Sequence, residues 1–147
     1  MRELTDEYIG ECRRLANDLK LEGRGLLWAE PAVIRRVCNG IGAEWMPEKL
    51  RGVLDTIHPA FVVPSIIHDL QYYYWNGAKS TFFRVNADFA ENGKKMARHL
   101  YGWHSPRRYL AYHTANKYKT LLDLFGEPAA KAARAQRMLD TEANANG

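Results

Sequence analysis

The chain has 147 residues, of which 46% are hydrophobic and 26% charged, a composition typical of one globular domain and not of a disordered chain. The net charge of +4 favours partners that carry phosphate groups, without deciding between nucleic acid and an anionic lipid surface. Two cysteines are too few for the disulfide framework expected of a small secreted protein. The first residues lack the apolar run typical of a signal peptide, and no stretch approaches roughly 18 apolar residues, so we expect neither export nor a membrane span.

Helical periodicity accounts for most of the chain, and no segment shows the alternation of a strand. Thr5 is a typical N-cap, proline stands where several helices should begin, and glycine stands where several should end. We expect an all-α fold with one domain over residues 1–141 and a disordered tail over 142–147. The expected helices cover about 6–22, 31–38, 64–75, 81–100, 106–125 and 128–139.

His68 and Asp69 lie in the middle of the expected helix 64–75, among apolar and aromatic neighbours. Adjacent side chains on a helix point about 100° apart, so these two must serve different partners. A histidine can accept a proton from water when a second group holds its other ring nitrogen, and an aspartate can bind a hard cation. A histidine on a partly buried helix is, however, more often a structural residue.

Asp88 is the candidate partner of His68. The connection at residues 76–80 is short, so the helices before and after it should pack as antiparallel neighbours. At about 1.5 Å per residue, His68 and Asp88 fall at similar distances from this turn. A glycine-bearing loop, Cys38-Asn39-Gly40-Ile41-Gly42, could in addition turn backbone carbonyls towards a calcium ion bound by Asp69.

Together, the Cys38–Gly42 loop, the sequence His68-Asp69-Leu70-Gln71-Tyr72 and the later Ala87-Asp88 resemble the phospholipase A2 superfamily, including small phage and parvovirus-capsid members. The resemblance covers roughly residues 30–100. It implies that His68 is the general base, that Asp88 holds its ring, and that Tyr72 hydrogen-bonds Asp88. It also implies that calcium is bound by Asp69 and the carbonyls of Cys38, Gly40 and Gly42. The implied partner is a phospholipid membrane surface. Because the sequence shows no signal-peptide pattern and no apolar run long enough to span a membrane, we expect the setting to be the cytoplasm of the producing cell or the virion.

Two other functions remain open. The chain could be a non-catalytic phage-type protein that interacts with phage structural proteins, because one fold can host unrelated functions. It could also bind nucleic acid, which we consider less favoured, through basic residues interleaved with aromatic ones. The same basic residues would suit an anionic bilayer, and a solvated helical face is the simplest interpretation. They are Lys94, Lys95, Arg98, Arg107 and Arg108.

Overall fold

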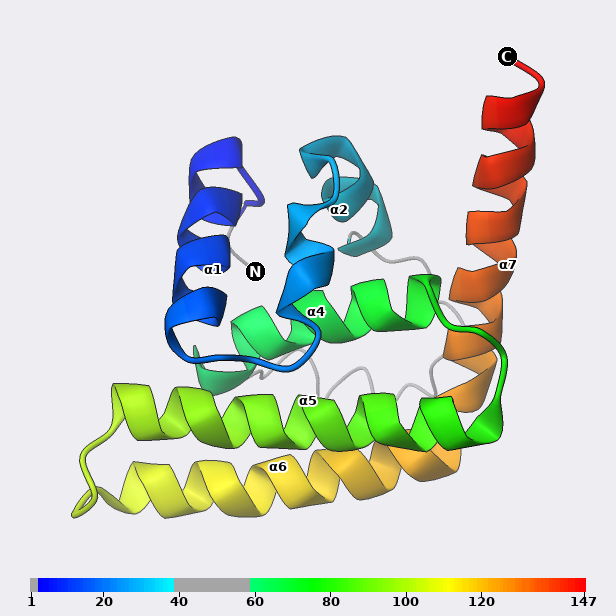
Figure 1. Ribbon diagram of the computed structural model, residues 1–147. Coiled ribbons are helices and arrows are strands. Elements are labelled where there is room, and N and C mark those ends of the chain that lie inside the picture. Colours follow the sequence, from blue (N-terminus) through cyan, green and yellow to red (C-terminus); the bar gives the residue numbers. More distant parts are fainter. Residues whose placement is uncertain (1–2, 39–58) are drawn as a thin grey trace.

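A computed structural model describes residues 3–38 and 59–147 (Figure 1). The described residues form helices and no strands, which confirms the all-α class. No helix in these two ranges is long and apolar enough to cross a membrane. The described elements, with two short 3-10 helices marked η, are α1 (Asp6–Asp18), η1 (Arg24–Trp28), α2 (Pro31–Cys38), η3 (Pro59–Phe61), α4 (Val62–Tyr73), α5 (Lys79–Leu100), α6 (Pro106–Phe125) and α7 (Glu127–Ala145).

The first helix begins as the sequence predicts and ends earlier. The backbone N–H of Tyr8 donates to Thr5 Oγ1 over 3.1 Å, which is the expected N-cap. The helix stops at Asp18, not near residue 22, because Lys20 and Gly23 both adopt positive φ angles, +52° and +74°. This left-handed backbone turns the chain into η1 and brings the turn against α5.

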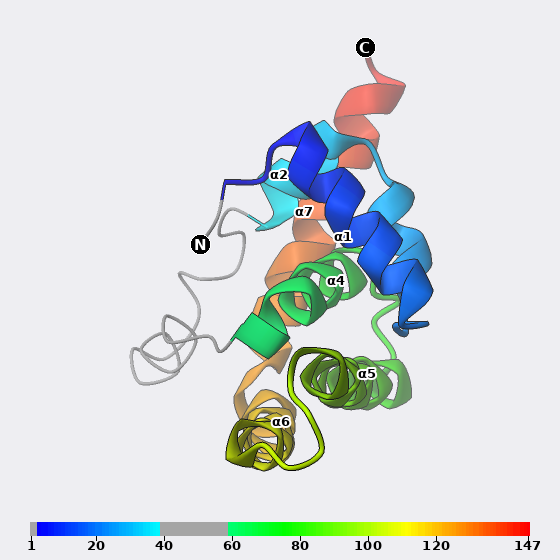
Figure 2. The same cartoon turned by 90° about the vertical axis from the view of Figure 1, so that its left-hand side faces the viewer.

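Helix α4 lies between two sets of elements (Figures 1 and 2). On one side lie α1, η1 and α2, and on the other α5 runs antiparallel to α4, with α6 beyond it. The layers meet around Phe61, whose ring centroid lies 5.7 Å from that of Phe89 on α5 and 5.3 Å from that of Tyr118 on α6. Gly93 faces the same ring so closely that a Cβ there would collide with it. A glycine inside a helix is normally unfavourable, but packing against Phe61 requires one at position 93.

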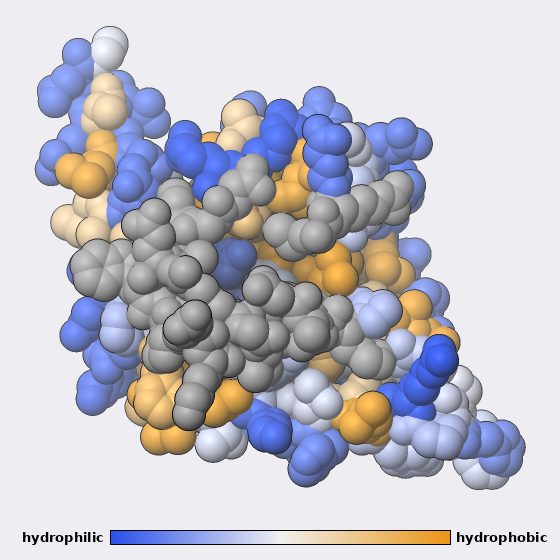
Figure 3. Space-filling model, turned by 180° about the vertical axis from the view of Figure 1, so that it is seen from behind, coloured by the Kyte–Doolittle hydropathy of each residue, from blue (hydrophilic) through white to orange (hydrophobic). Residues whose placement is uncertain are grey.

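The C-terminal segment is more ordered than the sequence predicts. Helix α7 continues to Ala145, whereas we expected disorder from residue 142. Asp140 accepts hydrogen bonds from Tyr73 of α4 over 2.5 Å and from Arg36 of α2 over 2.8 Å. These contacts fasten the late turns of a helix that shows hydrophilic residues on both sides of a pale-to-orange strip (Figure 3, upper left). No glycine or proline interrupts residues 129–146, so the helix propagates beyond this anchor.

Candidate functional site

The imidazole of His68 belongs to a buried polar network that joins three helices. His68 on α4 is only 5% exposed, and its Nε2 lies 3.0 Å from Oδ1 of Asn86 on α5. The Tyr72 hydroxyl donates to the same oxygen over 2.8 Å. Asn86 Nδ2 in turn donates to Asp123 on α6 over 2.9 Å, and Lys119 lies 2.5 Å from the other oxygen of that carboxylate.

This arrangement fixes the orientation of the Asn86 amide and the tautomer of His68. The Asp123 carboxylate only accepts hydrogen bonds, so it must face the Nδ2 end of the amide. Oδ1 therefore faces His68, and an amide oxygen accepts, so the proton of the neutral ring resides on Nε2. The lone pair then resides on Nδ1. The network consequently presents the nitrogen that could accept a proton from water on the side of the ring away from Asn86.

Burial sets the protonation states in this network. Desolvation lowers the pKa of His68 from 6.5 to about 4, although the hydrogen bond with Asn86 opposes the change. Burial also raises the pKa of Tyr72, so its hydroxyl keeps the proton that it donates to Asn86. At neutral pH the imidazole is therefore uncharged, the form in which a histidine can act as a base, but its low pKa makes it a weak one.

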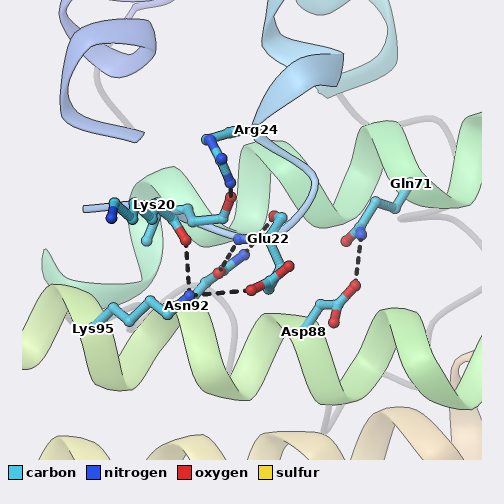
Figure 4. Close-up of polar contacts among 8 residues, drawn as sticks. Lys20, Glu22, Arg24, Gln71, Asp88, Asn92 and Lys95 are labelled. Carbon is cyan, nitrogen blue, oxygen red and sulfur yellow. Dashed lines mark hydrogen bonds and ion pairs between the residues drawn. The ribbon is translucent and has the colours of Figure 1, made fainter. Parts of the chain in front are cut away.

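Two predictions about Asp88 are wrong: it holds neither the His68 ring nor the Tyr72 hydroxyl. Asp88 Oδ2 accepts a hydrogen bond from Gln71 Nε2 over 3.0 Å (Figure 4). These two residues line a surface pocket of about 460 Å³ together with Glu22 and Trp75. Burial raises the pKa of Asp88, and the bond from Gln71 opposes this.

The physical reason is rotation about the axis of α5. Two residues span about 200° on a helix, so Asp88 points away from the face that carries Asn86. The two residues that position His68, Asn86 and Asp123, were missed by sequence reasoning. Asn86 could have been found, because it lies on the same stripe as Phe82 and Phe89 at helical spacing. Asp123 sits on α6, far along the chain, and no local pattern indicates its contact.

Asp69, the predicted calcium ligand, lies near the end of α2. Burial raises the pKa of its carboxyl to about 7. Burial also raises the pKa of the Cys38 thiol, and the Asp69 charge adds to this effect. Cys38 is the last residue of α2, and its Sγ lies 3.8 Å from the carbonyl of Ile66. A desolvated carboxylate beside this helix end suits a hard cation.

Calcium binding itself stays a prediction. Gly40 and Gly42 lie outside the described residues, and their carbonyls would have to complete the shell. Within residues 3–38 and 59–147, no group of three or more histidine, cysteine or acidic side chains could hold a metal ion.

The predicted basic surface divides into two parts. Lys95 donates to the carbonyl of Lys20 over 2.7 Å and lies 3.2 Å from Glu22 (Figure 4). Lys94 lies 3.4 Å from Glu91. These lysines are engaged in contacts within the protein. The arginines lie instead where α5 and α6 meet, and they are Arg98, Arg107 and Arg108.

Comparisons with known protein families, with curated proteins and with solved structures find no match to this chain.

Proposed function

We propose that the protein is a calcium-dependent hydrolase that cleaves the sn-2 ester of glycerophospholipids, with His68 as general base and Asn86 as the group that orients it. The observation that carries the proposal is the hydrogen bond between His68 Nε2 and Asn86 Oδ1, which Tyr72 and Asp123 support. This bond leaves Nδ1 as the basic nitrogen. Asp69 directly follows His68 and lies near Cys38 at the end of α2, which supports the calcium site that the resemblance to the phospholipase A2 superfamily implies.

In this mechanism, His68 Nδ1 removes a proton from water as the water oxygen attacks the ester carbonyl. The imidazolium keeps its Nε2 proton on Asn86 and returns the Nδ1 proton to the leaving glycerol oxygen as the ester bond breaks. The products are a fatty acid and a lysophospholipid. Calcium bound by Asp69 and the carbonyls of Cys38, Gly40 and Gly42 would supply stabilisation of the developing oxyanion. General-base assistance contributes typically about 10²–10⁴-fold.

Asn86 gives the site an amide where the resemblance implies a carboxylate. An amide oriented by Asp123 holds the ring and its tautomer as a carboxylate would. It brings no full negative charge next to the imidazolium that forms, because the Asp123 carboxylate lies on the far side of the amide. We therefore expect slow hydrolysis. We expect no alkaline shift of its pH optimum, because the neutral ring already dominates above about pH 5.

The test is release of fatty acid from phosphatidylglycerol vesicles with calcium or with chelator. We expect release only with calcium, loss in His68→Gln, and a higher calcium requirement in Asp69→Asn. Asp88→Asn is the matched control, because it removes an α5 carboxylate that does not contact His68. Release that continues in His68→Gln, or that fails only in Asp88→Asn, would contradict the assignment.

A second candidate is the non-catalytic phage-type protein. The observation that favours it is the 5% exposure of His68, combined with an amide in place of a carboxylate. In that case the network stabilises the contact of α4, α5 and α6 and does no chemistry. The wild-type protein would then release no fatty acid at any calcium concentration, while His68→Gln would still lower the melting temperature.

A further inference from the structure

The link between α5 and α6 lies in a region of the sequence that carries basic residues and no acidic ones. Residues 92–122 contain seven of the chain's 21 basic residues and none of its 17 acidic residues. Two of the seven, Lys94 and Lys95, are engaged in ion pairs with glutamates outside this region. Three of the others, Arg98, Arg107 and Arg108, belong to the link and the helix turns beside it, which we call the hairpin tip (residues 98–112).

The hairpin tip also exposes large apolar side chains. Trp103 is 66% exposed and Leu110 58% exposed, and Tyr109 and Leu100 are also exposed in this segment. Figure 1 shows that the tip projects beyond α1 and α4, and Figure 2 shows it facing the viewer. In the view from behind, the tip is the corner at the lower right, where pale and orange residues lie among blue ones (Figure 3).

Local contacts hold the hairpin tip in shape. The Tyr109 hydroxyl donates to the carbonyl of Trp103 over 2.9 Å, and the ring of His104 lies against the Trp103 ring. Arg108 Nε donates to the Tyr112 hydroxyl over 3.0 Å. Burial alone would raise the pKa of Tyr112, but hydrogen bonds from Arg108 and Arg98 outweigh it and lower that pKa. The guanidinium groups of Arg98 on α5 and Arg108 on α6 therefore both lie at the Tyr112 hydroxyl.

We propose that the hairpin tip docks the protein on an anionic phospholipid bilayer, with Trp103 and Leu110 entering the interface and the arginines contacting lipid phosphates. Tryptophan and tyrosine suit the boundary between headgroups and acyl chains, and basic residues add attraction to an anionic leaflet. Exposed leucines favour a bilayer over a nucleic acid, because they can enter hydrocarbon but cannot stack on bases. The purpose of the surface rests on the proposed function, but binding requires no hydrolysis.

The experiment is sedimentation of the full chain with vesicles of diether phosphatidylglycerol and phosphatidylcholine in the presence of a chelator. The lipids carry no ester and calcium is removed, so hydrolysis cannot influence the result. We expect binding that strengthens with the phosphatidylglycerol fraction and weakens with salt. The triple variant Arg98→Gln/Arg107→Gln/Arg108→Gln should bind roughly 100-fold more weakly, at about 1 kcal/mol per basic residue.

The matched control, Arg14→Gln/Lys79→Gln/Lys131→Gln, changes the net charge equally at exposed positions outside the hairpin tip, on α1, at the start of α5 and on α7. Equal weakening in both triple variants would show that only net charge matters and would overturn the proposal. Trp103→Ser/Leu110→Ser, a second test that leaves the charge intact, should also weaken vesicle binding. If this variant binds vesicles normally, the tip is not a membrane surface. The same conclusion follows if a single-stranded oligonucleotide at equal salt displaces the protein from vesicles, and does so only when the three arginines are present.

Discussion

Exchanging the amide and the carboxylate next to His68 provides the sharpest test of the buried network. The double variant Asn86→Asp/Asp123→Asn keeps every hydrogen-bonding position filled, because the amide introduced at position 123 can donate to the carboxylate introduced at position 86. It moves the negative charge to the side chain that contacts His68 Nε2, whose oxygen lies 3.0 Å from that nitrogen in the wild type. A carboxylate at this position favours the imidazolium, so the pKa of His68 must rise.

The size of the effect follows from the geometry. Two unit charges about 4 Å apart interact by about 4 kcal/mol at an effective dielectric constant of about 20. At about 1.36 kcal/mol per pH unit, the exchange should raise the pKa of His68 by about three pH units. A stronger base should also speed vesicle hydrolysis at neutral pH if His68 is the catalytic base.

The measurement is the titration of the His68 ring by NMR, which is separable from the other four histidines by comparison with His68→Gln. Asp123→Asn alone is the control and should leave the pKa of His68 within about one pH unit of the wild type, because no charge is placed next to the ring. If the exchange moves the pKa of His68 by less than about one unit while the fold is retained, Asn86 does not hold the ring in solution.

Three further results are expected. Between pH 6.5 and about 4 the unfolded chain binds a proton that folded His68 does not, so this residue should cost the wild type about 3 kcal/mol of stability as the pH falls through that window. Denaturant unfolding of wild type and His68→Gln at both ends of the window checks this, and equal pH dependence would contradict the assignment. Gly93→Ala should lower the free energy of unfolding by about 1–3 kcal/mol despite the better helix propensity of alanine, because the new Cβ collides with Phe61. A variant stabilised against denaturant would show that the contact is wrong. Asp140→Ala should speed amide hydrogen exchange in the C-terminal half of α7 by releasing Tyr73 and Arg36, and unchanged exchange there would mean that the anchor is unimportant.

The sequence was sufficient for the helices because their periodicity and end signals are local. Thr5, Pro31 and Pro106 stand at helix starts in the structure as predicted. The ends that differ are those decided by other parts of the chain. Helix α1 stops early where Lys20 and Gly23 turn the backbone to meet α5, and α7 extends past residue 141, where contacts with two distant helices hold it.

The candidate site shows the same division. The distance of His68 from the hairpin turn predicts correctly that its partner lies on α5. The identity of the partner depends on how α5 is rotated about its axis. The stripe of Phe82 and Phe89 indicates this rotation and points to Asn86. A carboxylate is the more usual partner of a catalytic histidine, and this preference favoured Asp88 instead. The part played by Asp123 depends on the docking of α6. Docking is a tertiary event, and nothing near residue 123 in the sequence specifies it.

The Asn86 amide also makes the tautomer of His68 depend on whether α6 has packed against α5. Its acceptor serves two groups on α4, while its donor is satisfied only by α6 among the described residues. A fragment that ends before residue 123 retains the α4–α5 hairpin and loses the carboxylate that keeps the amide from flipping. In such a fragment the ring would meet either end of the amide. During synthesis, the tautomer of His68 is therefore fixed only after α6 has emerged and packed, and a partly made chain holds a mixture of both tautomers.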